Sequence, residues 1–226
     1  IVYLEYLEQF DVVILGENGY FDNSSNIGDT ISVYVENGGS LILNTFYWQD
    51  RSDANNGGNW GALEEIDPLY GGSCDYAEGY LDPTLTIVHD LTSGVYELYC
   101  ERYRGGPTTL RDNATALAWW DDGDPLIVYN EPGAGRITAV TMWTAHENDN
   151  YAISGDFYLL WENAIRWTSS GDDWLTFSET HGVLGPNETA DINISLSTSG
   201  MEPGEKTYNI NIFNNDPTII MEHGQV

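Results

Sequence analysis

The loop that follows residues 40–44 is the first place in the sequence where chemistry could occur. The apolar segment SLILN is followed at once by TFYWQDR, which is polar and aromatic. In many α/β enzymes the residue directly after such a strand is the nucleophile, held on a sharp strand-to-helix turn. Here the turn carries Asn44, Thr45 and Phe46, so it is bulky and has no thiol. We therefore expect no catalytic residue at this turn and no enzymatic activity.

The same loop gathers aromatic side chains that suit a binding surface. Tyr47, Trp48 and Trp60 are accompanied by the charged residues Asp50 and Arg51. Flat rings beside amides and carboxylates could stack on a sugar or contact another protein. The loop also follows a predicted parallel strand, and open α/β sheets bind ligands at the carboxyl ends of their strands. These five residues form our candidate ligand-binding site; the alternative is that the loop packs onto its own domain.

The carboxylates do not identify a catalytic pair. A glycosidase needs two carboxylates about 5 Å or about 6.5–9.5 Å apart, and among 36 acidic residues some pair will meet that condition by accident. Hard oxygen ligands of the kind that Ca²⁺ prefers cluster in two segments without EF-hand spacing. The candidate calcium ligands are Asp22, Asp121, Asp122 and Asp124. We favour solvated turns over a calcium site, and we expect no other cofactor.

The net charge excludes two classes of partner. Seven basic residues against 36 acidic residues give a formal net charge of −29. Such a chain repels nucleic-acid phosphates and anionic lipid head groups. The sequence has no run of about 18 apolar residues, so we expect no membrane insertion. A surface so acidic and poor in lysine is typical of salt-tolerant proteins, although an ordinary acidic surface explains it equally well.

Cysteine and asparagine motifs together favour an extracellular location. Cys74 and Cys100 could form a disulfide that closes a loop of roughly 25 residues, worth on the order of 3 kcal/mol by chain entropy. Two free thiols in a reducing cytosol are the alternative. Four candidate glycosylation motifs begin at Asn23, Asn113, Asn187 and Asn193. We therefore expect an extracellular glycoprotein with one disulfide.

The apolar pattern predicts a β-α-β unit that positions the aromatic loop. Residues 1–10 read as a helix, and residues 11–16 as a strand whose continuous apolar run indicates burial on both faces. A second helix, with an apolar face over residues 27–35, ends at the glycine pair 38–39. SLILN is the next buried strand, and the crossover between the two strands should be right-handed.

Later segments predict the rest of the sheet, a closing helix and a second domain. Residues 114–130 read as a hairpin and residues 135–143 as a further strand. Apolar residues at helical spacing over 157–165 predict an amphipathic helix. Residues 169–173 read as a linker, and the period-2 alternation over 174–226 predicts a small antiparallel sandwich.

Five segments, taken in order, resemble the glutamine amidotransferase-like, flavodoxin-like domains of ThuA-like and other secreted multidomain proteins. They are DVVILGENG, YVENGGSLILNT, HDLTSGV, LAWWDDGDPLIVYNEPGAGRITAVTMW and ENAIRW. The resemblance covers residues 1–168 and implies a three-layer α/β domain whose first strand is missing. That scaffold carries a cysteine nucleophile on the turn after SLILN and a His-x-Glu pair, and neither is found here.

Residues 174–226 resemble the BACON-type, Ig-like repeats of prokaryotic surface proteins. The Trp-Leu start, the Gly-Val turn, the Pro-Gly step at 203–204 and the closing Asn-Asp-Pro carry this resemblance. The expected fold class is therefore an α/β three-layer flavodoxin-like domain plus a small all-β Ig-like sandwich, whose last strand looks incomplete.

The expected function follows from these two resemblances. We expect a non-catalytic extracellular structural or adhesive module of a larger cell-surface or filament-forming protein. The alternative is a carbohydrate-binding or carbohydrate-active protein that uses the aromatic loop after the second strand. The expected partners are other domains or subunits of the same surface protein. A missing first strand would leave a sheet edge that strand exchange could cover, unless the chain is a fragment of a longer one.

Overall fold

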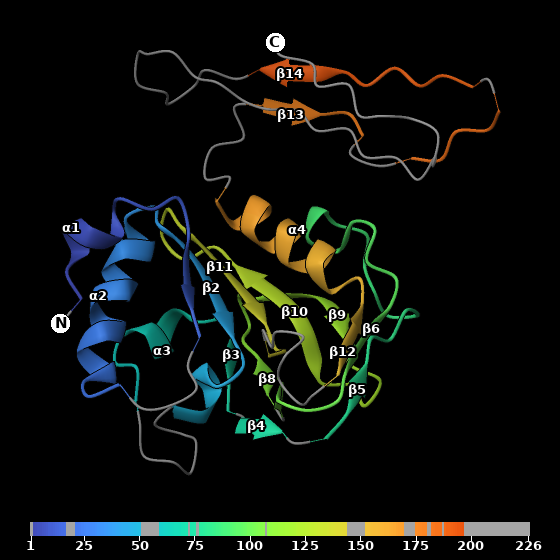
Figure 1. Ribbon diagram of the computed structural model, residues 1–226. Helices are drawn as coiled ribbons and strands as arrows, with labels where there is room; N and C mark the ends of the chain where they lie inside the picture. Colours follow the sequence, from blue (N-terminus) through green and yellow to red (C-terminus); the bar gives the residue numbers. More distant parts are fainter. Residues whose placement is uncertain are drawn as a thin grey trace.

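A five-stranded mixed sheet forms the centre of the protein (Figure 1). The structure is a computed structural model that describes residues 2–16, 21–50, 59–71, 73–75, 77–106, 108–143, 152–169, 175–179, 182–186 and 188–196. The strand order is β1 (Val13–Leu15), β2 (Ser40–Asn44), β11 (Arg136–Val140), β10 (Pro125–Asn130), β9 (Thr115–Trp119). β1, β2 and β11 are parallel, and β10 is antiparallel to both of its neighbours. This sheet confirms the α/β part of the expected fold class.

The N-terminal part of the chain forms the predicted β-α-β unit. The short helix α1 (Leu4–Leu7) precedes β1, and helix α2 (Ser24–Glu36) connects β1 to the parallel strand β2. Asn23 caps α2, because its side-chain oxygen accepts a hydrogen bond from the backbone N–H of Asn26 at 3.3 Å. The helix ends before Gly38, whose φ of 108° is a conformation that glycine adopts without steric cost.

Strand β1 differs from the prediction because it lies at the edge of the sheet. The side chain of Ile14 is 46% exposed, whereas all five residues of β2 are buried. A continuous apolar run had indicated burial on both faces, and that expectation is wrong for Ile14. An edge strand has a neighbour on one side only, so its apolar side chains are covered less completely.

Helices cover both faces of the sheet. The core that contains Val35 of α2 also contains Leu41 and Leu43 of β2, whereas the core that contains Leu160 of helix α4 (Phe157–Ser169) contains Ile42. Successive side chains of a strand point to opposite faces, so β2 contributes to two cores. Each fully buried side chain of this kind stabilises the fold by about 1.5–3 kcal/mol relative to its exposed state.

Short elements surround the sheet. They are the 3-10 helices η1 (Tyr47–Asp50) and η2 (Asp90–Thr92), helix α3 (Leu63–Ile66), the pair β3 (Leu69–Tyr70) and β8 (Thr109–Leu110), the pair β4 (Ser73–Asp75) and β7 (Arg104–Gly106), and the three-stranded sheet of β12 (Ile153–Gly155), β6 (Leu98–Cys100) and β5 (Gly79–Tyr80). Among the described residues, no helix has both the length and the apolar character needed to cross a lipid bilayer.

A two-stranded antiparallel hairpin follows α4. β13 (Leu175–Phe177) pairs with β14 (Ile194–Leu196), with Leu175 opposite Leu196 and Phe177 opposite Ile194. Residues 197–226 lie outside the described part of the chain. The division into residues 1–168, a linker at 169–173 and a domain at 174–226 stays a prediction.

Candidate functional site

The point where the chain changes sides of the sheet lies between β2 and β11, which are parallel neighbours. The chain that leaves β2 leads to α3, which contacts α2 on one face of the sheet. The chain that leaves β11 leads to α4, which packs on the other face. Open α/β sheets bind their ligands at the carboxyl ends of the strands at such a switch point. The residues directly after β2 and β11 are therefore the first to inspect.

Phe46 occupies the turn between β2 and η1 in a conformation that is rare for a bulky residue. Its φ is 77°, in the left-handed region. A residue without glycine's freedom costs of order 1–3 kcal/mol there and persists only when its surroundings hold it. The Phe46 ring is 7% exposed, and its centroid lies 4.8 Å from that of Trp143 and 5.5 Å from that of Tyr103. The position that a nucleophile would occupy is thus filled by a packed ring.

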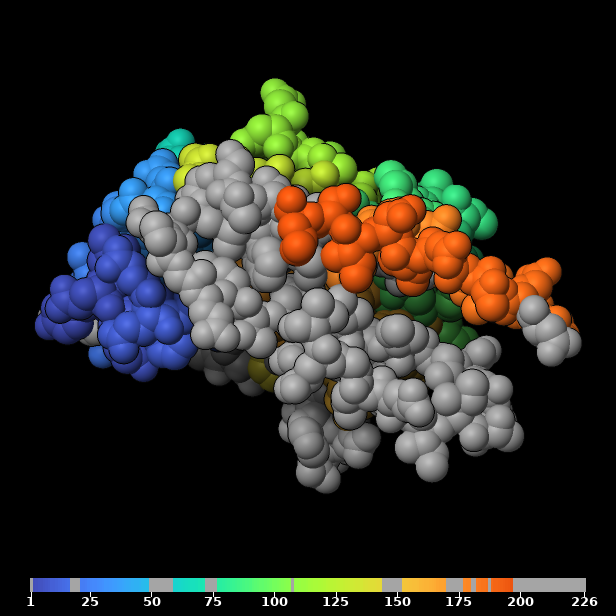
Figure 2. Space-filling model, turned by 90° about the horizontal axis from the view of Figure 1, so that it is seen from above, coloured from blue at the N-terminus to red at the C-terminus, as the bar shows by residue number. Residues whose placement is uncertain are grey.

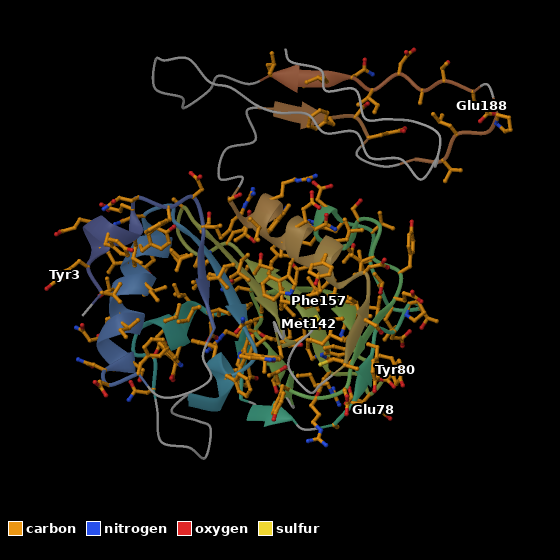
Figure 3. All side chains as sticks on the ribbon, in the orientation of Figure 1. Tyr3, Glu78, Tyr80, Met142, Phe157 and Glu188 are labelled. Carbon is orange, nitrogen blue, oxygen red and sulfur yellow. The ribbon has the colours of Figure 1, made fainter. Side chains whose placement is uncertain are left out.

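Trp143 and Tyr103 complete this cluster from distant parts of the sequence. Trp143 follows β11, and Tyr103 precedes β7 and has a positive φ of 62° itself. Met142, beside Trp143, is fully buried and is labelled in the interior of the molecule in Figure 3. The sequence analysis did not select Tyr103 or Trp143. The only sequence signal was that aromatic residues follow two predicted strands.

Two polar side chains lie buried at the same end of β2. Asn44 is 2% exposed and Thr45 is fully buried. Within the described part of the chain, the Asn44 Oδ1 and Thr45 Oγ1 atoms have no hydrogen-bond partner. A Cβ atom on Gly16, which follows β1, would lie 2.6 Å from the Asn44 amide, so a larger residue there would require the Asn44 side chain to move. These oxygens are enclosed by protein rather than presented to a ligand.

The aromatic residues proposed as a ligand-binding surface are core residues. Tyr47, Trp48 and Trp60 are each fully buried, so none offers an open face to a sugar ring. The Trp60 indole N–H donates to the Tyr47 backbone oxygen at 3.1 Å, and the two rings lie 5.4 Å apart. The binding-surface interpretation is therefore wrong for these three residues, and the loop packs onto its own domain. The side chains of Asp50 and Arg51 lie outside the described part.

A buried carboxylate anchors this loop. Asp67 is fully buried; its Oδ2 accepts from the Tyr47 hydroxyl at 2.7 Å and its Oδ1 from Arg111 Nε at 3.0 Å. The Arg111 guanidinium also lies over the Tyr70 ring, 5.3 Å from its centroid. This network joins η1, α3 and β8. The sequence analysis missed it, because the three residues share no local spacing.

Cys100 and His89 do not form a catalytic couple with the turn. Cys100 is a free, fully buried thiol in the core on the α4 side, so the expected disulfide with Cys74 is not formed. Burial raises the pKa of Cys100 to about 11, which keeps it protonated and unreactive. His89 stacks on Tyr129, which pairs with Thr138 in the middle of β11, whereas Trp143 follows the carboxyl end of that strand. The side chain of Cys74 lies outside the described part.

The acidic turn between β9 and β10 uses its carboxylates for contacts within the protein. Asp122 forms an ion pair with the buried Arg104, and Asp121 Oδ1 accepts from Tyr80 N at 3.0 Å. Burial alone would raise the pKa of Asp122, but the hydrogen bond and charge of Arg104 hold it below its usual range. In the described ranges, no three His, Cys, Asp or Glu side chains come together as metal ligands, so Asp22, Asp121, Asp122 and Asp124 do not form a calcium site there.

Three of the four glycosylation motifs lie in the described part of the chain. Asn23, Asn113 and Asn193 are all exposed, and the Asn23 side chain also caps α2. Asn187 lies outside the described residues. Glycosylation at these sites stays a prediction.

A hollow of about 240 Å³ lies beside the first turn of α2. It is lined by Phe21, Asp22, Asn23, Asn26 and Ile27. The Phe21 ring meets the buried Trp60 ring edge-on at 5.5 Å, which fixes one wall. The hollow therefore combines an apolar wall with one carboxylate and amide groups.

Solved structures share this fold at low sequence identity. A cytoplasmic protein of Salmonella typhimurium LT2 is 16% identical, with a TM-score of 0.56 over 74% of this chain and 75% of that chain. A second cytoplasmic protein of Salmonella typhimurium is 17% identical, with a TM-score of 0.53 over 73% and 74%. A protein described as ThuA-like from Parabacteroides merdae is 18% identical, with a TM-score of 0.52 over 78% and 74%. No protein-family model and no curated protein matches the chain.

These structures establish the fold and correct the expected function. The chain shares the α/β fold of ThuA-like proteins, as the sequence resemblance implied. The expectation of an extracellular structural or adhesive module of a surface or filament protein is wrong, because the similar structures are cytoplasmic and ThuA-like proteins. These structures do not show the Ig-like repeat that the sequence predicts.

Proposed function

We propose that this protein is a non-catalytic domain of the ThuA-like fold, which acts by binding rather than by turnover. The observation that carries the proposal is Phe46: at the turn after β2, the place for a nucleophile holds a buried phenyl ring. Trp143 and Tyr103 pack against this ring at the switch point of the sheet.

The other reactive groups support the same proposal. Nucleophilic catalysis requires a nucleophile and a base within hydrogen-bond reach. Cys100 donates its thiol hydrogen to the Arg102 backbone oxygen at 2.7 Å, and His89 Nδ1 accepts from Leu91 N at 3.2 Å. Both groups are thus committed to local contacts within separate elements.

Turnover assays and alkylation test this proposal. We expect the full chain to turn over no amide, ester or glycoside substrate. We also expect iodoacetamide to leave Cys100 unmodified in the native protein. Phe46→Cys is the matched variant for these assays. It places a thiol on the turn and leaves the other two aromatic residues, Tyr103 and Trp143, unchanged. Hydrolysis of any of these substrates by the purified wild type would contradict the proposal.

A second candidate function is the binding of a small polar ligand in the hollow beside α2. The Asp22 carboxylate favours a cationic or hydroxyl-bearing ligand, and Phe21 and Ile27 offer apolar contact. A thermal-shift screen with small amines and polyols tests it. A stabilising compound should lose its effect with Asp22→Asn and keep it with Asp112→Asn, an exposed control. No stabilising compound, or equal stabilisation of both variants, would exclude this hollow.

We infer that residues 174–226 form an Ig-like sandwich of the BACON type. The antiparallel β13–β14 pair supports this inference, since its register places Leu175 opposite Leu196 and Phe177 opposite Ile194. A two-stranded hairpin is marginally stable in water by itself, so this pair needs further strands. Solution NMR of the full chain should give strand chemical shifts beyond residue 196; random-coil shifts there would contradict it.

A further inference from the structure

We propose that the open edge of β1 and the apolar side chains beside it bind an extended, basic segment of a partner polypeptide. We call this surface the β1 edge and define it by Tyr3, Tyr6, Phe10 and Ile14. It is distinct from the turn at Phe46 and from the hollow beside α2. The proposal therefore goes beyond the absence of turnover and can fail independently of it.

The β1 edge has main-chain groups available for another strand. In the described sheet, β1 pairs with β2 and has no strand on its other side. Every second residue of such a strand directs its N–H and C=O away from its neighbour. Residues 11–16 contain neither lysine nor proline, the residues that commonly protect an edge from pairing. An extended peptide could therefore add to the sheet.

Exposed apolar side chains occur in β1 and in the residues that precede it in the sequence. Tyr3 and Tyr6 are each 57% exposed, Phe10 is 47% exposed and Ile14 is 46% exposed. Figure 3 shows Tyr3 pointing away from the body of the molecule. The rings of Tyr6 and Phe10 meet edge-on, with centroids 5.3 Å apart. The N-terminal residues gather at one end of the face seen in Figure 2.

The backbone of this segment is held in place before a partner arrives. The buried Tyr34 of α2 donates its hydroxyl hydrogen to the Phe10 backbone oxygen at 3.1 Å. Leu7 of α1 packs in the core that contains α2. A surface that is already ordered loses little conformational entropy on binding, which favours affinity.

The charge around the β1 edge selects a basic partner. Glu5, Glu8 and Asp11 are exposed in the residues that precede β1, and residues 1–50 contain no lysine or arginine. A second copy of this chain would bring the same carboxylates together and be repelled. An extended segment that alternates apolar and basic residues would satisfy the edge, the rings and the carboxylates at once. Because β1 has only three residues, charge and apolar contact must supply most of the affinity.

Fluorescence anisotropy with a designed peptide tests the proposal. The probe is a short fluorescein-labelled peptide that alternates valine with lysine, and the matched probe carries glutamate in place of lysine. We expect the lysine probe to bind the full chain and the glutamate probe not to bind. We also expect Ile14→Lys to weaken binding at least about tenfold, since it adds a like charge at the centre of the edge. Hydrogen exchange at residues 12–16 should slow when the probe is bound.

The matched control variant is Val88→Lys, which replaces an apolar residue that is 78% exposed elsewhere on the surface. It should bind the lysine probe like the wild type, and both variants should unfold at the wild-type temperature. Equal affinity for Ile14→Lys and Val88→Lys would show charge attraction without a site and would overturn the proposal. Absence of binding by the lysine probe would overturn it as well. Sedimentation analysis could also show that the wild type forms a dimer and that Ile14→Lys is a monomer. That result would assign the edge to a second copy of this chain and would overturn the proposal of a basic partner.

Discussion

At the scale of single residues, Phe46 shows how packing can hold a strained backbone. Its positive φ would normally favour glycine, and a phenyl side chain keeps it only because Trp143 and Tyr103 enclose the ring. At this position the positive φ destabilises the folded state, and burial of the ring stabilises it. Two substitutions can separate these contributions.

We predict that Phe46→Ala and Phe46→Gly differ in an unusual direction. Phe46→Ala should lower the free energy of unfolding by about 3–5 kcal/mol, because it removes a buried ring. Phe46→Gly removes the same ring but relieves the positive φ, so it should be more stable than Phe46→Ala by about 1 kcal/mol. Urea unfolding measures both. Val88 is the control position, because its φ is not positive. There, Val88→Ala should be more stable than Val88→Gly. If Phe46→Ala were likewise more stable than Phe46→Gly, the backbone at Phe46 would not be strained.

His89 should make the stability of the protein depend on pH. Burial lowers the pKa of His89, Arg136 lowers it further, and Asp90 and Glu131 oppose the shift. The unfolded chain, with a histidine pKa of about 6.5, therefore binds more protons than the folded chain. The stabilisation is complete above that pKa and is lost as the pH falls through the folded pKa.

The expected result is a difference between two variants rather than a total pH profile, because 36 carboxylates also titrate. His89→Asn keeps a side-chain acceptor for the Leu91 N–H but cannot be protonated. Between pH 7.5 and pH 5, the wild type should lose more free energy of unfolding than His89→Asn in urea titrations. Parallel losses in both proteins would show that His89 does not contribute.

At the scale of elements, the loop after β2 is fixed by a buried polar network. Tyr47 in η1 donates to Asp67 directly after α3, and Arg111 after β8 donates to the same carboxylate. A buried carboxylate stabilises a fold only when donors surround it. The network therefore determines where η1 lies, and with it the Phe46 turn.

We predict that Tyr47→Phe lowers the free energy of unfolding by about 1–3 kcal/mol, because it removes a hydrogen bond to a buried charge. Tyr96→Phe is the control, since Tyr96 is 76% exposed and should show no change in chemical denaturation. A Tyr47→Phe variant as stable as the control would mean that Arg111 alone satisfies the carboxylate.

The elements that the sequence predicts well are those with strong local periodicity. The helix over 27–35, the buried strand SLILN and the closing helix appear as α2, β2 and α4. Exposure of Ile14 could not be predicted, because an apolar run does not reveal whether its strand is central or at an edge. Burial of Tyr47, Trp48 and Trp60 was missed for a related reason: their cover comes from residues far away in the sequence, such as Asp67. The Phe46 turn itself was anticipated, but its partners Tyr103 and Trp143 depend on tertiary contacts.

At the scale of the whole molecule, charge is strongly unbalanced. The four described ion pairs involve Arg104, Arg111, Arg136 and Arg166, each with a neighbouring carboxylate. With only seven basic residues against 36 acidic ones, most carboxylates repel one another. Such repulsion disfavours the compact state and is screened over about 10 Å at 0.1 M salt and about 3 Å at 1 M.

We predict that the unfolding temperature rises from low salt to about 1 M sodium chloride. For a chain of this size, each kcal/mol gained corresponds to roughly 2–4 °C. Sodium sulfate at equal ionic strength serves as the comparison, since screening depends on ionic strength alone. A rise in sulfate without one in chloride would indicate preferential exclusion from the surface and would contradict the electrostatic explanation.

The two cores on either side of β2 each contain fully buried tryptophan: Trp48 and Trp60 on the α2 side, and Trp120 on the α4 side. Indole emission shifts to longer wavelength when water reaches the ring, so each core carries its own optical reporter. Variants that keep tryptophan on one side only would reveal whether both halves melt together. Because the same strands supply side chains to both cores, loss of one core should expose the other, and the two spectral transitions should coincide.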